Sequence, residues 1–176
     1  MSGHNKWSKI KHKKAATDSK KSKEFGKFSR LITMEVREAG GNTDSPGVKL
    51  AVERARKINM PSTNIDRAIK NALDKSGRAD ERIIYEMYGP GGSAVLIDIV
   101  TDSRNRTAAE IKHLLSKLGL ALSKPGSAAW AFENNEGEWT ASIRVSITQT
   151  DKDKLLEITE ALEDHDDVSA VYTNVV

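Results

Sequence analysis

Three stretches in the first half of the chain carry apolar side chains three and four residues apart, the spacing of helices that bury one face. The first stretch runs from about Lys20 to Gly40-Gly41, whereas residues 1–16 show no strong period. The stripes contain, in order, Phe25, Phe28, Leu31, Ile32, Val36 and Ala39; Val48, Ala51, Val52, Ala55 and Ile58; and Ile65, Ala68, Ile69, Ala72 and Leu73. They predict a small all-helical domain.

Capping residues and helix breakers place the ends of the second and third helices. Ser45-Pro46 is typical of a helix start, with serine as the N-cap and proline in the first turn. Met60-Pro61 should end the second helix, because the residue before a proline avoids the helical region. We expect Ser62 or Thr63 to cap the third helix.

In the second half of the chain, the pattern of apolar residues changes from helical spacing to patterns typical of strands. Ile83–Tyr88 has the composition of a strand, and Ala94–Val100 is a nearly continuous apolar run typical of a buried strand. Thr107 and Glu110 match a capping box that would begin a helix. We expect further strands and one further helix, capped by Thr150, with the strands at Ser127–Glu133, Trp139–Thr148 and Val168–Asn174.

The order of elements from Ala94 onward is β-α-β-β-α-β, the ferredoxin-like pattern. Right-handed crossovers would place both helices on one face of the sheet. We therefore predict an α+β fold. An N-terminal all-α three-helix domain with a flexible N-terminal tail covers residues 1–78. A ferredoxin-like βαββαβ domain with one extra edge strand, Ile83–Tyr88, covers residues 79–176. The boundary lies in the polar segment Lys75–Arg82.

Charge divides the chain in the same way. Residues 1–80 contain 19 Lys and Arg against 9 Asp and Glu, a net charge of +10. Residues 81–176 contain 9 against 16, a net charge of −7, and the whole chain carries +3. A basic half predicts a polyanionic partner. The acidic half could dock back on the basic half when no ligand is bound.

The basic residues are densest near the N-terminus, where five lysines between Lys6 and Lys14 have no acid among them. Lysines bind phosphates as compact charges, and aromatic rings and histidines can stack on bases. The alternative interpretation is a solvated tail. The predicted nucleic-acid-binding residues are Lys6, Trp7, Lys9, Lys11, His12, Lys13, Lys14, Lys20, Lys21, Lys23, Lys27, Arg30, Lys49, Arg54, Arg56 and Lys57.

Two further charged segments leave alternatives open. Arg104, Asn105 and Arg106 lie where a buried strand meets a helix N-terminus, so they could contact a phosphate or an acidic partner, or be solvated loop residues. The acids of Glu163–Asp167 end a helix, where the helix dipole disfavours them. A partner, docking onto the basic domain, or a plain solvated turn would each account for them. Their spacing matches no metal motif.

Several classes of protein are excluded or disfavoured. The chain has no cysteine, and its four histidines are scattered with no catalytic grouping around them. We expect no enzyme activity, cofactor, metal or small-molecule substrate. No apolar run approaches the roughly 20 residues of a membrane span, and no apolar stretch follows the N-terminal charges as in a signal peptide. We expect a cytoplasmic protein. The sequence leaves the oligomeric state open and favours a monomer.

Five phrases of the sequence resemble the YebC family, also called the YebC/PmpR transcriptional regulator family. They are GHNKWSKIKHKKAA (3–16), NMPSTNIDRAIKNA (59–72), YGPGGSAVLI (88–97), TDSRNRTAAEIKH (101–113) and LEDHDDVSAVYTN (162–174). The resemblance implies a cytoplasmic protein with an all-helical first domain followed by an α/β part. It differs from family members that insert a further α/β domain between the strands near Phe132 and Ala141, where only ENNEGEW stands here. The chain resembles a shortened form that lacks this inserted third domain.

The resemblance implies a nucleic-acid-binding regulator of gene expression, a DNA-binding transcriptional regulator in the first interpretation. Relatives such as the mitochondrial translational activator of cytochrome c oxidase imply the alternative, a translation factor bound to ribosomal RNA that activates translation or relieves stalling. A protein-interaction module without direct nucleic-acid contact is the second alternative.

Overall fold

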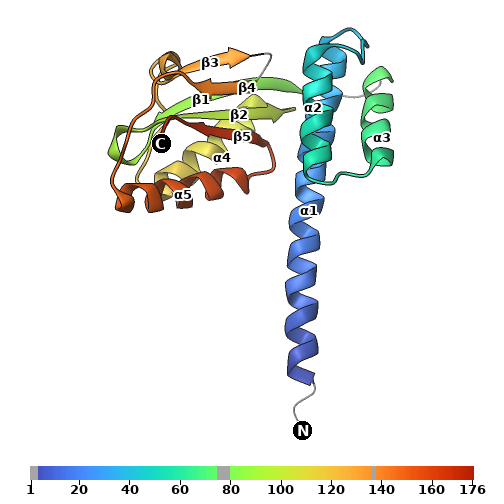
Figure 1. Cartoon of the computed structure of the whole chain (residues 1–176), viewed down its shortest axis with the longest axis horizontal. Helices are drawn as coiled ribbons and strands as arrows, with labels where there is room; N and C mark the ends of the chain where they lie inside the picture. Colours follow the sequence, from blue (N-terminus) through green and yellow to red (C-terminus); the bar gives the residue numbers. More distant parts are fainter. Residues whose placement is uncertain (1–3, 75–79, 136–137) are drawn as a thin grey trace.

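The computed structural model of the chain describes residues 4–74, 80–135 and 138–176, with side chains described from Lys20 onward. The predicted boundary at Lys75–Arg82 falls largely on residues 75–79, which lie outside the described residues. The α+β class is confirmed, because three helices precede a part that mixes strands and helices (Figure 1). Its elements are α1 (His4–Glu38), α2 (Pro46–Lys57), α3 (Ser62–Leu73), β1 (Glu81–Tyr88), β2 (Ala94–Thr101), α4 (Arg104–Lys117), β3 (Phe132–Asn135), β4 (Glu138–Ala141), α5 (Gln149–Glu163) and β5 (Val168–Thr173). Among the described residues, no helix has both the length and the apolarity that crossing a membrane requires.

Helix α1 begins at His4, so the segment that we expected to be a flexible tail is helical. The expectation rested on the missing apolar stripe, but lysine and alanine favour helix on their own, and residues 4–25 contain neither proline nor glycine. The helix has 35 residues and is therefore about 52 Å long. Figure 1 shows its N-terminal half projecting away from the rest of the molecule.

The C-terminal half of α1 packs with α2 and α3 around one apolar core, which also includes Val100 of β2. The predicted stripes form this core, except that Leu73 is 54% exposed. Ser45 caps α2 as expected, its Oγ accepting a hydrogen bond from the Val48 N–H at 3.4 Å. The N-cap of α3 is Pro61, which makes no side-chain hydrogen bond, so the caps expected at Ser62 or Thr63 are wrong.

The main sheet has the strand order β1-β2-β5, and both pairings are antiparallel. All residues of β2 are buried, as the apolar run predicts. Its alternate residues Val95, Ile97 and Ile99 pack against α4 and α5, which cover one face of the sheet. The opposite face carries Ala94 and Leu96 under the small β3–β4 hairpin. Both helices thus lie on one face, as expected.

The pairing of the later strands differs from the ferredoxin-like prediction. Within the described part of the chain, strands β3 and β4 pair only with each other, in a separate two-stranded sheet. The reason is that β1 pairs along the full length of β2 on one side and β5 occupies the other, so β2 has no free edge. Strand β4 ends at Ala141 instead of Thr148, and Ile143 is 47% exposed.

Two predicted helix caps are also displaced. Helix α4 begins at Arg104 after the N-cap Ser103, so Thr107 lies inside the helix, where its side chain is fully buried. Helix α5 is capped by Thr148, whose Oγ1 accepts a hydrogen bond from the Asp151 N–H at 3.2 Å, and not by Thr150.

The carboxylate of Glu86 fixes the loop that leads into β3. It lies on β1 with 7% of the side chain exposed, and it accepts hydrogen bonds from three backbone N–H groups. These belong to Gly126, Ala128 and Ala129, at 2.6, 2.7 and 2.8 Å. Burial opposes the ionisation of Glu86, but the three donors outweigh it and lower the pKa of the carboxyl.

We predict that Glu86→Gln lowers the free energy of unfolding by about 2–4 kcal/mol, because an amide cannot accept three charge-assisted bonds. The lowered pKa means that this contribution is complete above the ordinary value of 4.5 and is lost as the pH falls below it. Chemical denaturation at several pH values measures both effects. A variant as stable as the parent at pH 7 would contradict this role.

Candidate nucleic-acid interface

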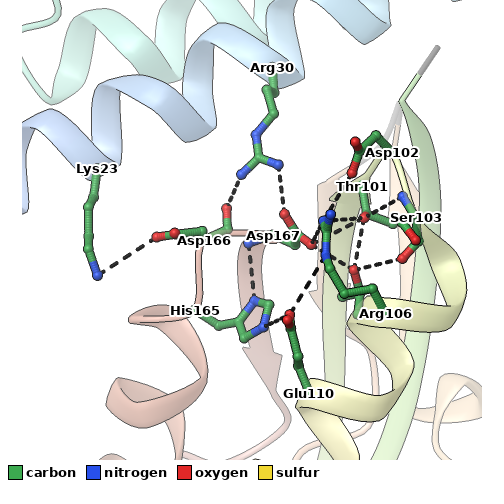
Figure 2. Close-up of polar contacts among 11 residues, drawn as sticks. Lys23, Arg30, Thr101, Asp102, Ser103, Arg106, Glu110, His165, Asp166 and Asp167 are labelled. Carbon is green, nitrogen blue, oxygen red and sulfur yellow. Dashed lines mark hydrogen bonds and ion pairs between the residues drawn. The ribbon is translucent and has the colours of Figure 1, made fainter. Parts of the chain in front are cut away.

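The carboxylate of Asp167 joins the helical domain to the α/β domain (Figure 2). It lies just before β5 and is 5% exposed. Arg30 of α1 donates to Oδ1 at 2.6 Å, and Arg106 of α4 donates to Oδ2 at 2.8 Å. The hydroxyl of Thr107 lies 2.6 Å from Oδ2, and that of Thr101 donates at 3.1 Å. Three elements therefore meet at one buried charge.

These contacts determine the ionisation of Asp167. Burial opposes the charged form, but the Thr107 hydroxyl and the guanidinium groups of Arg106 and Arg30 outweigh it. Together they hold the pKa of the Asp167 carboxyl well below its ordinary range. Asp167 is therefore a permanent anion at any physiological pH.

Outside this buried contact, the basic side of α1 meets the end of α5. Lys23 lies 3.7 Å from Asp166 and 4.0 Å from Asp164, and all three side chains are largely exposed. Lys27 donates to the carbonyl oxygen of Glu163, and Arg30 donates to that of Asp166. Burial lowers the pKa of Lys27, although the neighbouring acids oppose this shift. The cations of α1 thus balance both the acids and the negative end of the α5 dipole.

A second ionic contact joins the domains along the other edge of α1. Arg82 of β1 binds both carboxylate oxygens of the fully buried Asp98, at 2.9 and 2.5 Å. Its Nη1 also donates to Glu35 of α1 at 3.3 Å. Arg54 of α2 donates to the Tyr172 hydroxyl at 3.3 Å. The domains are therefore linked by charged groups on two sides.

One group of side chains has the composition of a metal site. Potential ligand atoms of Glu110, His165 and Asp167 lie within 4.8 Å of one another. However, His165 Nδ1 accepts the Asp167 N–H at 3.1 Å, which leaves the proton on Nε2, 3.0 Å from Glu110. Asp167 is already bound by two arginines. This arrangement is that of a hydrogen-bonded bridge between α4 and the turn before β5.

The structure divides the predicted nucleic-acid-binding residues into separate groups. Those from Lys6 to Lys14 lie on the projecting half of α1, and their side chains are outside the described part. Lys20 and Lys21 are exposed on α1, whereas Lys23, Lys27 and Arg30 contact the acidic end of α5. On α2, Lys49 pairs with Asp44, Lys57 pairs with Glu53, Arg54 contacts Tyr172, and Arg56 is exposed.

The three candidate residues after β2 form the first turn of α4. Arg104 lies 3.2 Å from Glu81, and Asn105 is exposed. Arg106 contacts Asp167 and lies 3.0 Å from Asp102. Two of the three thus have partners within the chain, and Asn105 lies on the surface.

Sequence reasoning missed the buried polar residues that organise these contacts. The local pattern places Thr107 in a capping box and indicates no role for Arg82 or Asp98. A signal was present for Asp98, because a single acid inside the apolar run Ala94–Val100 needs a buried partner. Docking of Glu163–Asp167 on the basic domain was one of the open alternatives, and the structure has that contact.

The fold and the contacts define a class: an α+β protein in which a basic helical domain is joined by ion pairs to an acidic α/β domain. Two family models match the chain, the TACO1/YebC protein N-terminal domain over residues 5–75 and the TACO1/YebC second and third domain over residues 80–136. The chain belongs to the TACO1/YebC family.

Curated relatives agree with this assignment. The chain is 43% identical over 165 residues to a probable transcriptional regulatory protein of Halothermothrix orenii, covering 93% of this chain and 63% of that protein. It is 45% identical over 164 residues to one of Thermotoga maritima, covering 92% and 61%. The chain thus spans less than two thirds of these relatives, consistent with a shortened form.

A solved structure supports the fold. A conserved hypothetical protein of Aquifex aeolicus matches with a TM-score of 0.76 at 27% identity, over 90% of this chain and 91% of that one. The second family match ends at residue 136, within the segment where the inserted domain of other members is expected.

We predict that Asp167→Asn lowers the free energy of unfolding by about 2–4 kcal/mol, because it leaves two arginines around a neutral group. Since the pKa of Asp167 is lowered, its contribution is present above the ordinary value of 3.8 and is lost as the pH falls below it. Denaturant unfolding at pH 7 measures the loss. The exposed pair Asp164→Asn/Asp166→Asn is the control and should change the stability by less than about 1 kcal/mol. Equal effects of the two changes would contradict the distinction between buried and exposed contacts.

Proposed function

We propose that the chain is a nucleic-acid-binding regulator of gene expression that acts in the cytoplasm, in the first instance as a DNA-binding transcriptional regulator. The observation that carries the proposal is the projecting N-terminal half of α1. Its sequence holds five lysines between Lys6 and Lys14 and no acid before Asp18. A helix with this charge, held away from the body of the protein, can lie along a phosphate backbone over several turns.

Two further observations support the proposal. The curated relatives are named probable transcriptional regulatory proteins. In addition, Lys6, Lys9 and Lys13 follow one another at the three- and four-residue spacing that Lys20, Lys23, Lys27 and Arg30 repeat. Residues at this spacing share a face of a continuous helix, so one basic face would run along most of α1.

The alternative target is ribosomal RNA, with a role in activating translation or relieving stalled ribosomes. It is favoured by the character of the predicted contacts, which are mostly lysines. Lysines neutralise phosphates as compact charges, and recognition by charge and shape is what ribosomal RNA offers abundantly. Under a third proposal, the α/β domain binds a protein partner without nucleic-acid contact.

Crosslinking in cells, followed by sequencing of the bound nucleic acid and ribosome sedimentation, separates these proposals. Enrichment of promoter DNA, with the protein absent from ribosomes, is the result that the transcriptional proposal predicts. Recovery of ribosomal RNA and co-sedimentation with ribosomes would replace it with the translational one. Recovery of neither nucleic acid would leave the protein-partner proposal.

We predict that replacing the five N-terminal lysines by glutamine removes most of the salt-dependent affinity. Five phosphate contacts give a log–log salt slope of about −4.5 on duplex DNA, or about −3.5 on single strands. The variant should therefore lose most of this slope in binding titrations between about 50 and 200 mM salt. The substituted residues are Lys6, Lys9, Lys11, Lys13 and Lys14.

The control is a second variant with the same change of net charge in the acidic half. Its substitutions to glutamine are at Lys112, Lys117, Lys124, Lys152 and Lys154. If the two variants lost affinity and slope equally, net charge rather than the projecting helix would account for binding. An unchanged slope in the N-terminal variant would refute the role of these lysines.

A further inference from the structure

Two stripes of opposite charge face each other across an open groove between α1 and α5. The groove has a volume of about 590 Å³. Its basic wall carries Lys20, Lys23 and Lys27 of α1, which lie three and four residues apart on one face of that helix, together with a single acid, Glu24. Its acidic wall is formed by Glu157, Glu160 and Glu163 of α5 and the C-cap Asp164, and Asp166 lies beyond it on the following turn. We call these five acids the acidic segment.

The contacts between the stripes differ strongly in strength. The buried Arg30–Asp167 pair, at 2.6 Å, anchors the turn to α1. The outer pairs of Lys23 with Asp164 and Asp166 are 4.0 and 3.7 Å long and largely exposed. Exposed pairs of this kind are weak and are screened by salt. The outer pairs can therefore open while the anchor holds.

The acidic segment is an unusual sequence for the end of a helix. Acids at a helix C-terminus are disfavoured by the dipole, and α5 has no basic residue in its last turn. What compensates them is the basic face of α1, because Lys27 and Arg30 donate to carbonyl oxygens at this end of α5 and in the following turn. A row of anions along these cations has the same charge pattern as a phosphate backbone.

We propose that the acidic segment occupies, within the same chain, a surface of α1 that binds the phosphate backbone of a nucleic acid, so that the two compete for Lys20, Lys23 and Lys27. The proposal rests on the proposed nucleic-acid-binding function and adds a regulatory contact to it. A nucleic acid bound along the N-terminal half of α1 extends onto this surface only by displacing the outer acids. The acidic segment thereby lowers affinity and makes binding less sensitive to salt, because its ion pairs take the place of phosphate contacts on α1.

The test compares Asp164→Asn/Asp166→Asn with the parent chain, using a fluorescently labelled DNA duplex of random sequence as the probe. Both substitutions are on exposed side chains, so the variant keeps the Arg30–Asp167 anchor and the fold. We expect affinity at about 50 mM salt to rise roughly two- to tenfold. The salt slope should become steeper by about 0.9 to 1.8, one to two additional phosphate contacts.

The matched control is Glu133→Gln/Glu138→Gln, which removes two exposed acids from the β3–β4 hairpin. It changes net charge equally, so an equal gain in affinity would overturn the proposal and assign the effect to long-range charge. A second outcome would also overturn the proposal: the parent chain binds with the salt slope expected for its five N-terminal lysines, and Asp164→Asn/Asp166→Asn changes neither the affinity nor the slope. That outcome would leave the proposed function intact. Absence of binding by all three proteins would refute DNA binding as the proposed function and, with it, this competition for DNA.

Discussion

The arrangement of the two domains depends on one buried anion, the carboxylate of Asp167. It receives Arg30 from the helical domain and Arg106 from the α/β domain, and the Thr107 hydroxyl accompanies them. A buried carboxylate without such partners would be strongly destabilising, so the three groups must be present together. The orientation of the basic α1 relative to the acidic α5 follows from this contact.

The same contact fixes where the two oppositely charged halves of the chain meet. The positive half and the negative half meet where the end of α5 contacts the middle of α1, and also through Arg82 and Arg54. The N-terminal half of α1 projects beyond this area (Figure 1). The same helix therefore has an intramolecular contact at its centre and, under the proposed function, an intermolecular one at its N-terminal end.

Much of the fold could be predicted from local patterns. The apolar stripes gave the three helices, Ser45 gave a helix start, and the run Ala94–Val100 gave the buried strand, because each depends on neighbours within a few residues. The pairing of β3 with β4 alone could not be predicted, since it depends on β1 and β5 occupying both edges of β2. Strand order is a property of the whole sheet, and periodicity does not encode it.

The candidate site could be predicted from the sequence only in part, for the same reason. Charge counting located the basic α1 and the acidic end of α5, and it allowed their docking as one alternative. It could not identify Thr107 or Arg106 as partners of Asp167, because they lie about 60 residues apart in sequence. Thr107 also matched a capping box, and the local pattern concealed its buried role.

A double-mutant cycle between Arg30 and Asp167 tests the central claim most directly. Arg30→Gln, Asp167→Asn and the double variant are compared with the parent chain in denaturant unfolding at pH 7. A coupling free energy of about 1–3 kcal/mol is the predicted result, since the two groups are in contact and share a buried charge. A coupling near zero, with additive effects of the two substitutions, would show that this contact does not hold the domains together.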